Sequence, residues 1–458
     1  MSALWTSDAI AAATGGTASA PFEISGVTFD SREVGPGDLF IALKGEATDG
    51  HRFLDQAFAH GAAGAIVSTP TPHPHVLVAD TMAALEALGV AARARTDATI
   101  IGVTGSVGKT GTKEALFAAL DRGAPGKVHR SVKSYNNHTG VPLSLARMPA
   151  DCRYAVLEMG MNHAGELAAL TRFVRPHVAI ITNVGPVHIE FFKDESGIAD
   201  AKAEIFQGLE PGGTAIIPFD NVHRERLVAA ANGLDARIVT FGRGEGADVR
   251  ALEVMRTATG GTFVTARLVS RELSSTIGQP GDHLVSNSLA VLAAVEAAGA
   301  DVALAGLALA DLGGLPGRGA RFLTMVPGGT ALVIDESYNA NPSSMRATLA
   351  MLATEPAPRK IALLGQMGEL GVDSPAFHAG LAAPVIEAGI SHAILVGEGM
   401  APLAIALEGQ VDFVHVPDAA AALAHLKTVL SAGDAVLIKG SNSVGLMTVV
   451  TALGGEKP

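Results

Sequence analysis

The sequence predicts an α/β protein of three domains built on mostly parallel sheets. The chain has 458 residues, and at roughly 150 residues per domain this length suggests about three domains. Short runs of β-branched residues alternate with stretches rich in alanine and leucine, which is typical of parallel α/β layers. Glycine is abundant, with 53 residues, and aromatic residues make up 4%, a composition that suits many tight turns between strands and helices.

Charge and composition exclude several classes of protein. Lysine and arginine number 33 against 45 acidic residues, a net charge of −12, so a nucleic-acid binder is not expected. No run of about 18 uncharged apolar residues is present, so we expect no membrane span. The single cysteine, Cys152, excludes an intrachain disulfide and a CxxC metal site and favours a cytoplasmic location. The first residues carry no basic cluster, so we expect no secretory signal.

The first predicted domain, the smaller one, covers residues 1–98. Short apolar runs predict its strands, and a longer stretch rich in alanine and leucine predicts a helix before the next domain. The strands are expected at Val27–Arg32, Leu39–Leu43 and Ala65–Ser68, and the helix at Thr81–Arg95.

The second predicted domain covers residues 99–318, and the third covers residues 319–458. Alternating polar and apolar residues over Val249–Leu268 predict an antiparallel hairpin, and the glycines of Gly313–Gly319 predict a hinge between the two domains. Other strands of the second domain are expected at Thr99–Gly105, Tyr154–Gly160 and Val178–Gly185, and its helices at Ile198–Leu209 and His283–Gly299. Strands of the third domain are expected at Thr330–Ser337, Lys360–Gly365, Ala393–Gly397 and Ala435–Gly440.

The strongest local motif is TGSVGKTGTKE, residues 104–114, between a predicted buried strand and a predicted helix. Its glycines let successive backbone N–H groups face a phosphate, which makes the second domain P-loop ATPase-like. Lys109 adds a positive charge for the β- and γ-phosphates, and the Thr110 hydroxyl is expected to bind Mg²⁺. Val103 stands where the longer GxxxxGK[ST] motif begins, so this is the shorter GxxGK[ST] form. The predicted nucleotide-binding loop comprises Gly105, Ser106, Val107, Gly108, Lys109, Thr110 and Gly111.

A nucleotide switch protein is the natural rival interpretation of a phosphate loop. A guanine-specific GTPase carries an NKxD loop after a buried strand. The comparable loop here is TNVG, Thr182–Gly185, which has neither the lysine nor the aspartate. This difference argues against the switch interpretation.

Three further side chains are expected beside the phosphate loop. Glu158 ends a predicted strand, His188 follows the end of another, and Lys202 lies on a predicted helix. Each alone is an ordinary residue at an ordinary position. Together with the phosphate loop they follow the carboxyl ends of successive strands, where ligands bind in open α/β sheets.

The motifs together resemble the Mur ligase family, ATP-dependent enzymes that form amide bonds in bacterial cell-wall synthesis. The resemblance covers essentially the whole chain and implies a Rossmann-like third domain. Strings in the family's order are TGSVGKT, VLEMGMN, TNVGPVHIEFF, the helix with Asn287, PGRGAR with Arg318, and DESYNANP at Asp335–Pro342.

Within the family, the sequence is most similar to members that add D-alanyl-D-alanine to UDP-N-acetylmuramoyl-tripeptide. The strings are SYNNHTGVPLSL from Ser134, DESYNANP, and LLGQMGELG with His378 downstream. The segment Phe29–Phe53 matches the uridine-nucleotide domain, and the DNPR string of the preceding tripeptide synthetase is absent. Gln366 replaces an expected aspartate and Asn442 an expected arginine, which puts substrate contacts of the third domain in doubt.

The resemblance implies a reaction through an acyl phosphate and a set of roles for these residues. ATP activates the tripeptide carboxylate, the dipeptide amine attacks it, and cations are needed between the reacting anions. By resemblance, Thr110 and Glu158 hold one Mg²⁺, while His188 and a carbamylated Lys202 hold a second. Lys109 neutralises the transferred phosphate, and Arg318 clamps it when the third domain closes.

The remaining assignments concern the nucleotide and the two substrates. Carbamylation requires a neutral amine, so a depressed pKa is expected for Lys202. The resemblance places Asp335 at the ribose of ATP, with Asn287 and Asn339 as candidates for its adenine. Its candidates for the UDP-sugar-peptide are Ser31, Arg32, Asn136, Asn137 and Thr139.

Several alternatives stay open at this point. A folylpolyglutamate synthase shares the phosphate loop but not the N-terminal segment, a tripeptide synthetase uses a different amine, and an ATP-binding module would not catalyse. The sequence does not distinguish meso-diaminopimelate from L-lysine as the third residue of the tripeptide. A monomer without nucleic-acid partners is expected.

Overall fold

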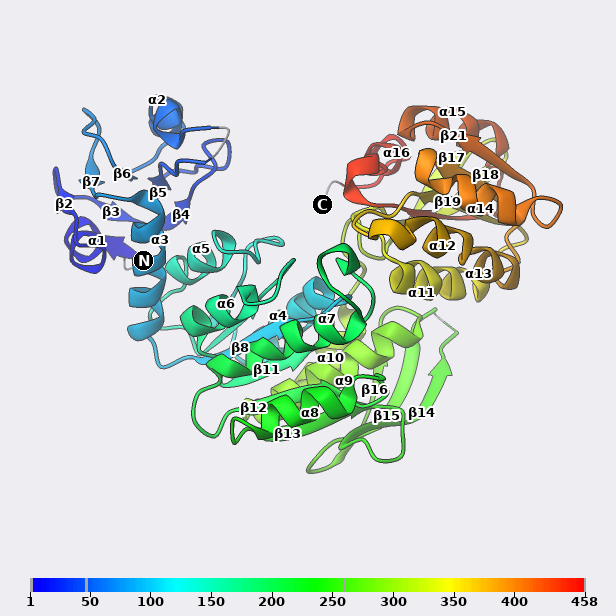
Figure 1. Cartoon of the computed structure of the whole chain (residues 1–458), viewed down its shortest axis with the longest axis horizontal. Coiled ribbons are helices and arrows are strands. Elements are labelled where there is room, and N and C mark those ends of the chain that lie inside the picture. Colours follow the sequence, from blue (N-terminus) through cyan, green and yellow to red (C-terminus); the bar gives the residue numbers. More distant parts are fainter. Residues whose placement is uncertain (1–2, 46–47, 259, 457–458) are drawn as a thin grey trace.

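The computed structural model describes residues 3–45, 48–258 and 260–456. Residues 46–47 of the uridine-nucleotide segment and residue 259 of the predicted hairpin lie outside the described residues. Figure 1 shows three lobes in chain order, with the N-terminal lobe (blue) and the C-terminal lobe (orange and red) at opposite ends of the central one. The α/β class and the three-domain arrangement predicted from the sequence are therefore confirmed.

The N-terminal domain contains a five-stranded sheet in the order β2-β7-β6-β5-β4. Strands β4 to β7 are parallel, and β2 pairs antiparallel with β7. The sheet strands are β2 (Thr17–Ala18), β4 (Gly26–Thr28), β5 (Asp38–Ile41), β6 (Gly64–Val67) and β7 (His75–Leu77), beside the pair β1 (Trp5–Thr6) and β3 (Glu23–Ile24). The helices are α1 (Ser7–Thr14), η1 (Gly50–Phe53), α2 (Leu54–Ala59) and α3 (Thr81–Ala94).

The first predicted strand is shorter than expected. Strand β4 ends at Thr28 rather than at Arg32. The Asp30 carboxylate accepts a 3.0 Å hydrogen bond from the Arg32 backbone N–H, and the Asp30 carbonyl accepts one from the N–H of Glu33. An aspartate that bonds its own downstream backbone favours a turn over a strand.

The central domain is organised around a nine-stranded sheet in the order β16-β15-β14-β13-β12-β11-β8-β10-β9. All neighbouring strands from β9 to β14 are parallel, and β14, β15 and β16 are antiparallel, as predicted for the hairpin. The strands are β8 (Thr99–Thr104), β9 (Val128–Arg130), β10 (Tyr154–Glu158), β11 (Val178–Ile181), β12 (Thr214–Pro218), β13 (Arg237–Gly242), β14 (Val249–Arg256), β15 (Thr262–Arg267) and β16 (Glu272–Ile277).

Helices cover both faces of this sheet and form two hydrophobic cores. One core joins the sheet to α4, α9 and α10, and the other joins it to α5, α6, α7 and α8. A sheet buried on both faces agrees with the continuous apolar runs of its strands. The helices are α4 (Lys109–Gly123), α5 (Gly140–Ala146), α6 (Glu166–Val174), η2 (Ile189–Phe191), α7 (Glu195–Ala203), η3 (Glu204–Gly208), α8 (Arg224–Asn232), α9 (Asp282–Ala297) and α10 (Val302–Asp311).

The helix predicted at Ile198–Leu209 is divided in the structure. The α-helix α7 ends at Ala203 and the 3-10 segment η3 follows it. Tertiary contacts with α6 explain the change, because the Thr171 hydroxyl donates to the Ile205 carbonyl at 2.8 Å. The Glu204 carboxylate also accepts hydrogen bonds from two backbone N–H groups at the start of α6. Glu204 thereby caps the start of α6, and the chain after Ala203 continues as a 3-10 segment instead of as α-helix.

The C-terminal domain contains a six-stranded sheet in the order β17-β18-β22-β19-β20-β21, parallel except for the edge strand β17. The strands are β17 (Ala320–Val326), β18 (Gly329–Glu336), β19 (Lys360–Gly365), β20 (His392–Val396), β21 (Phe413–Val416) and β22 (Ala435–Lys439). The helices are α11 (Pro342–Ala353), η4 (Gly371–Asp373), α12 (Ser374–Ala379), α13 (Ala382–Glu387), η5 (Glu398–Met400), α14 (Ala401–Leu407), α15 (Ala419–Val429), η6 (Asn442–Val444) and α16 (Met447–Ala452).

A glycine-rich turn connects the central and C-terminal domains. Gly317 and Gly319 adopt φ values of 72° and 88°, and the backbone of Leu315 bonds that of Arg318 across the turn. Positive φ at both positions explains why glycine is required there.

Among the residues that the structure describes, none of the helices combines the length and apolar character that crossing a bilayer needs.

Candidate active site

A cleft lies between the central and C-terminal domains. Its cavity has a volume of about 580 Å³ and opens beyond the carboxyl ends of β8, β10 and β11. The predicted residues that line it are Ser106, Val107, Gly108, Lys109, Thr110, Gly111, Asn136, Glu158, His188, Asn287, Arg318 and Asn339. The structure therefore brings together predicted residues that are as far as 233 positions apart, from Ser106 to Asn339, since 339 − 106 = 233.

The phosphate loop joins β8 to α4 in a tightly packed turn. Gly105 and Gly108 adopt φ values of 151° and 89°, which favour glycine. A Cβ on Gly105 would lie 1.9 Å from the Thr182 hydroxyl, and one on Gly108 would lie 2.9 Å from the Asn287 amide oxygen. The loop thus needs glycine for both backbone conformation and space, while Asn287 lies directly against it.

A hydroxyl and a carboxylate suitable for Mg²⁺ lie side by side at the start of α4. The Thr110 hydroxyl donates a 2.9 Å hydrogen bond to Glu158, whose side chain is buried at the end of β10. Asn136 donates to the other oxygen of the same carboxylate at 2.8 Å. Oxygen ligands about 2.9 Å apart suit adjacent positions around Mg²⁺, whose ligands lie at about 2.0–2.1 Å.

The two lysines of the predicted site come from different helices, α4 and α7. Lys109 donates a 2.6 Å hydrogen bond from Nζ to the Gly105 carbonyl. Burial lowers the pKa of its ammonium, the Glu158 charge opposes that effect, and the Arg318 charge adds to it. The second, Lys202, is 2% exposed on α7, and burial followed by the charge of Lys109 lowers its pKa well below the usual value.

Lys202 has an unusual environment for a lysine. Within the described part of the chain, its ammonium group makes no hydrogen bond and no ion pair. A buried ammonium without a partner is costly, so the neutral amine is favoured there. Lys202 does not line the cleft itself but lies behind it, close enough to interact with both Lys109 and His188.

His188 connects the central domain to the C-terminal domain. Its ring Nδ1 contacts the Glu369 carboxylate, which belongs to the loop after β19. Burial lowers the pKa of His188, Glu369 opposes this, and the charges of Lys109 and Lys202 lower it further. Both residues of the pair adopt positive φ, 60° for His188 and 59° for Glu369, which is uncommon outside glycine.

Arg318 reaches the same group of side chains from the interdomain turn. Its guanidinium stacks on the Tyr338 ring at 4.0 Å and donates to the Ser134 hydroxyl at 3.3 Å. The Ser134 hydroxyl in turn lies 3.4 Å from that of Thr110. The hydroxyl groups of Ser134 and Thr110 therefore connect Arg318 to the expected Mg²⁺ position.

Asp335, expected at the ribose, does not line the cleft in this structure. It is 1% exposed, and one carboxylate oxygen accepts a 2.6 Å hydrogen bond from the N–H of Gly317. The other oxygen accepts from the backbone and hydroxyl of Ser337 at 3.0 and 2.6 Å. Its observed contacts hold the interdomain turn in place.

Of the residues expected to bind the UDP-sugar-peptide, Asn136 lines the cleft, and the others lie outside it. Asn137 accepts hydrogen bonds from the backbone and hydroxyl of Thr139, and so shapes the start of α5. In the N-terminal domain, the Ser31 hydroxyl donates to Gln56, and the exposed Arg32 pairs with Asp30 at 2.6 Å.

A polar bridge connects the N-terminal segment with the cleft. The Glu33 carboxylate lies next in sequence to Arg32 and accepts hydrogen bonds from Lys133 at 2.5 Å and from Tyr135 at 3.3 Å. Ser134 and Asn136, which line the cleft, alternate with these two partners along the chain. The bridge therefore links the segment that carries Ser31 and Arg32 to the segment that contributes Ser134 and Asn136 to the cleft.

Sequence reasoning missed Lys113 and Lys439. Lys113 lies one helical turn after Lys109, and its buried Nζ is 3.9 Å from the Glu158 carboxylate. Lys439, also buried, lines the cleft, donates to the Asn339 carbonyl at 2.9 Å and pairs with Glu336 at 3.4 Å. The i, i+4 spacing from Lys109 was a usable signal for Lys113. Lys439 lies within the strand predicted at Ala435–Gly440 and carried no such signal.

The two departures from the family pattern have different surroundings. Gln366 accepts a 2.9 Å hydrogen bond from the Gly399 backbone and supports the loop after β20. Asn442 is exposed in η6. Neither side chain lines the cleft.

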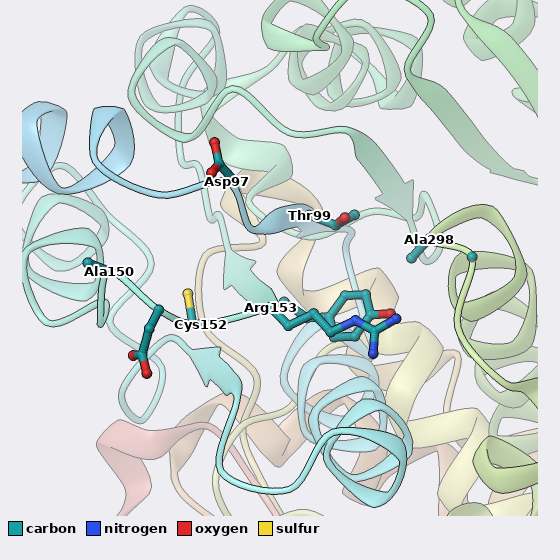
Figure 2. A pocket seen from close by; sticks show the side chains of 9 residues that line it. Asp97, Thr99, Ala150, Cys152, Arg153 and Ala298 are labelled. Atoms are coloured by element: carbon teal, nitrogen blue, oxygen red, sulfur yellow. The ribbon is translucent and has the colours of Figure 1, made fainter.

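A second hollow, of about 470 Å³, lies at the amino ends of β8 and β10. Figure 2 shows Cys152 and Arg153 on one of its walls and Thr99 and Ala298 across from them. The Cys152 thiol is buried, and burial raises its pKa. The amino ends of parallel strands are not where α/β sheets bind ligands, so the interdomain cleft is the better candidate.

Comparison with known proteins agrees with this geometry. Three family models match: "Mur ligase family, catalytic domain" over residues 23–127, "Mur ligase middle domain" over 103–295, and "Mur ligase, glutamate ligase domain" over 321–442. The UDP-N-acetylmuramoyl-tripeptide–D-alanyl-D-alanine ligase of Synechocystis is 36% identical over 444 residues, covering 95% of this chain and 93% of that protein. The chain belongs to the Mur ligase family.

Solved structures of Mur ligases share the whole fold. MurF from Acinetobacter baumannii matches with a TM-score of 0.85 and 32% identity over 98% of each chain. The MurF ligase from Thermotoga maritima, solved in complex with ADP, matches with a TM-score of 0.76 and 26% identity, covering 93% of this chain and 96% of that one. The Mur ligase fold therefore extends through all three domains of this chain.

Proposed function

We propose that this Mur ligase joins D-alanyl-D-alanine to UDP-N-acetylmuramoyl-tripeptide, with conversion of ATP to ADP and phosphate. The observation that carries the proposal is the cleft itself. It places a phosphate loop, a buried carboxylate with an adjacent hydroxyl, and an arginine of the interdomain turn around one cavity. The named relatives, whose names state this dipeptide and tripeptide, support the choice of substrates.

The reaction requires activation of a poor electrophile. A carboxylate oxygen of the tripeptide attacks the γ-phosphorus of ATP, the bond to ADP breaks, and an acyl phosphate forms. The neutral amine of the dipeptide then attacks the acyl carbon and expels phosphate, with loss of one proton from nitrogen. An α-amino group has a pKa of about 8, so a useful fraction is neutral near neutral pH.

The phosphate loop and two cationic side chains serve the first step. Backbone N–H groups at the start of α4 bind phosphate oxygens, aided by the helix N-terminus. Lys109, now bonded to the Gly105 carbonyl, is positioned to turn toward a bound γ-phosphate. Arg318 adds a second positive charge from the opposite wall, where Tyr338 supports its guanidinium.

Thr110 and Glu158 fit one Mg²⁺ because their oxygens are already adjacent. When bound, Mg²⁺ would screen the negative charges of the phosphates and of the acceptor carboxylate. His188 and Lys202 are the candidates for a second ion, with Lys202 carbamylated. Its buried and unpartnered nitrogen supports this role, since a neutral amine is the form that reacts with carbon dioxide.

The remaining residues are assigned to the nucleotide and the sugar-peptide. Asn287 and Asn339 line the cleft and offer amide donors and acceptors for the adenine. Asp335 would reach the ribose only after a local rearrangement, because its oxygens hold the interdomain turn here. The UDP-sugar-peptide is assigned to Ser31, Arg32, Asn136, Asn137 and Thr139.

The enzyme is proposed to act as a monomer. Its lone, unpaired cysteine supports a reducing, cytoplasmic setting. Sedimentation in the presence of both substrates would measure the oligomeric state.

The choice of substrates is tested by phosphate release and product mass. The enzyme is mixed with ATP, Mg²⁺ and UDP-N-acetylmuramoyl-tripeptide, with either D-alanyl-D-alanine or a single amino acid. Sustained release is expected only with the dipeptide, together with a product heavier by one dipeptide residue. Turnover with UDP-N-acetylmuramoyl-dipeptide and a diamino acid, or with glutamate and a folate, would contradict the proposal. Varying the third tripeptide residue in this assay identifies the preferred one.

A further inference from the structure

Lys113 of α4 is a buried lysine that the steps of the proposed reaction do not use. Its side chain is 0% exposed, and three acceptors surround its ammonium group. They are the Ser131 carbonyl at 3.2 Å, the Lys133 carbonyl, and the Glu114 carboxylate at 3.0 Å. An ammonium group has three N–H donors, so these acceptors account for all of them. The Glu158 carboxylate lies beyond hydrogen-bond distance from the same nitrogen, at 3.9 Å.

The two carbonyls belong to one segment, residues 131–136, which leads from β9 to the cleft. The Ser131 hydroxyl accepts a 2.9 Å hydrogen bond from the N–H of Glu158. Lys133 adopts a φ of 49°, which is uncommon for a residue other than glycine, so surrounding contacts must hold this conformation. Lys113 supplies such a contact by donating to the Lys133 carbonyl. The segment is therefore fixed from α4 at the point where its backbone is strained.

The same segment carries two side chains to the expected Mg²⁺ position. The Ser134 hydroxyl lies 3.4 Å from that of Thr110, and the Asn136 amide donates to Glu158 at 2.8 Å. Thr110 and Asn136 bind different oxygens of the Glu158 carboxylate, and these two contacts together set its orientation. Movement of the segment would displace Asn136 and thereby change the direction in which the carboxylate points.

We propose that Lys113 is a positioning residue for the Mg²⁺ ion, because it fixes residues 131–136 so that Glu158 presents its oxygens to the ion. This role rests on the proposed function, in which Thr110 and Glu158 hold that ion. The Glu114 carboxylate lies closer to the ammonium than Glu158 does, at 3.0 Å against 3.9 Å, so the attraction of the ammonium is directed mainly at Glu114. Side chains that orient a metal ligand commonly change metal affinity by about 10- to 100-fold.

ADP binding with and without Mg²⁺ tests the role of Lys113. Calorimetry of the full chain gives the Kd of ADP in EDTA and in excess Mg²⁺, and the ratio of the two values measures the coupling between ion and nucleotide. Wild type is expected to bind ADP more tightly with Mg²⁺. Lys113→Met should lower this ratio by about 10-fold, while the Kd of ADP in EDTA should stay close to that of wild type. Arg122→Met removes a cation of the same helix that pairs with Asp311, and it should keep the wild-type ratio.

A lysine that only stabilises the fold would give a different result. Folding damage lowers the Tm and the fraction of protein that binds ADP, but it leaves the ratio unchanged in the folded fraction. Lys113→Gln keeps a hydrogen-bond donor and should show a smaller loss, and it is the test variant if Lys113→Met does not fold. An unchanged ratio in the folded variant would overturn the role of Lys113 and leave the proposed function intact. An equal loss of ADP affinity in Mg²⁺ and in EDTA would also overturn it. If Mg²⁺ has no effect on ADP binding by wild type, the proposed metal site itself is wrong, and the role of Lys113 is wrong with it.

Discussion

Lys109 already lies close to two charged side chains, Glu158 and Arg318, without a bound phosphate. Its Nζ bonds the Gly105 carbonyl at 2.6 Å, and the charges of Glu158 and Arg318 act on it in opposite directions. A phosphate in the loop would replace the carbonyl as its partner. In the proposed reaction, Lys109 would place its positive charge against the phosphate that is transferred.

Lys109→Ala should lower kcat by at least about 10²-fold, because a charge directed at the transferred phosphate is lost. The fold should persist, since glycine conformations and the Ser106–Gly185 hydrogen bonds hold the loop. Phosphate release measures the effect, and Lys127→Ala, which removes an exposed lysine, is the control. Near-normal turnover of Lys109→Ala would refute its proposed role.

Lys202→Ala should be severely impaired although the residue lies behind the cleft wall. We expect the loss because a carbamate ligand is removed, and Lys202→Arg should fail equally since arginine is not carbamylated. NMR of protein in ¹³C-bicarbonate should show a carbamate signal that both variants lack. Lys193→Ala, an exposed lysine before α7, should keep signal and activity. Wild-type activity of Lys202→Ala over a range of Mg²⁺ concentrations would disprove the carbamate.

At the scale of elements, β9 and α5 are linked by one half-buried histidine. Nε2 of His129 bonds the Ser144 carbonyl at 2.7 Å. Burial lowers its pKa from 6.5 to about 4; the Ser144 bond opposes this, and Arg147 and Arg130 add to it. Because α5 also packs against α3 of the N-terminal domain, the link supports the interface between the two domains.

His129 makes folding stability depend on pH. Between pH 6.5 and about 4 the unfolded chain binds this proton and the folded chain does not, so stability falls as the pH is lowered. Between pH 7 and pH 5, His129 is expected to lower the free energy of unfolding by an amount on the order of 2 kcal/mol. Urea unfolding at pH 7 and pH 5 measures this change in stability. The change should be smaller in His129→Gln than in wild type, while the glutamine amide keeps a donor for the Ser144 carbonyl. An unchanged difference would assign the pH dependence to other groups.

At the scale of the whole molecule, the two halves of the cleft touch directly. The His188–Glu369 contact crosses the domain boundary, as does the 3.2 Å ion pair between Arg256 and Glu355. Ser343 on α11 faces Gly185 of the central domain. ATP and two substrates must enter a cleft whose walls are in contact, so we expect rotation about Gly313–Gly319.

A disulfide across the cleft tests this movement. A Cβ built on Gly185 lies 3.9 Å from that of Ser343, which is a suitable separation for a disulfide, and the buried Cys152 does not compete. Oxidised Gly185→Cys/Ser343→Cys should turn over at least about 10-fold more slowly than the same protein after reduction. The reduced double variant and each single variant are the controls. Equal rates before and after reduction would exclude the required opening.

The sequence alone determined the class of fold, the phosphate loop and most strand positions. Apolar runs and glycine turns are local signals, because strand burial and the φ preference of glycine act within a few residues. For this reason Thr99–Gly105 and the hairpin at Val249–Leu268 were predicted close to their observed bounds. Local signals failed where tertiary contacts intervened, as at η3, where Thr171 and Glu204 link η3 to α6.

Only the tertiary structure decided which side chains meet in the cleft. The contact of Glu369 with His188 and the hydrogen bond of Arg318 to Ser134 join segments 181 and 184 residues apart, since 369 − 188 = 181. Asp335 likewise points away from the cleft. One of its carboxylate oxygens accepts a hydrogen bond from the backbone of Gly317, which lies in the interdomain turn. Such pairs depend on how whole domains pack, and no periodicity along the chain encodes the distance between them.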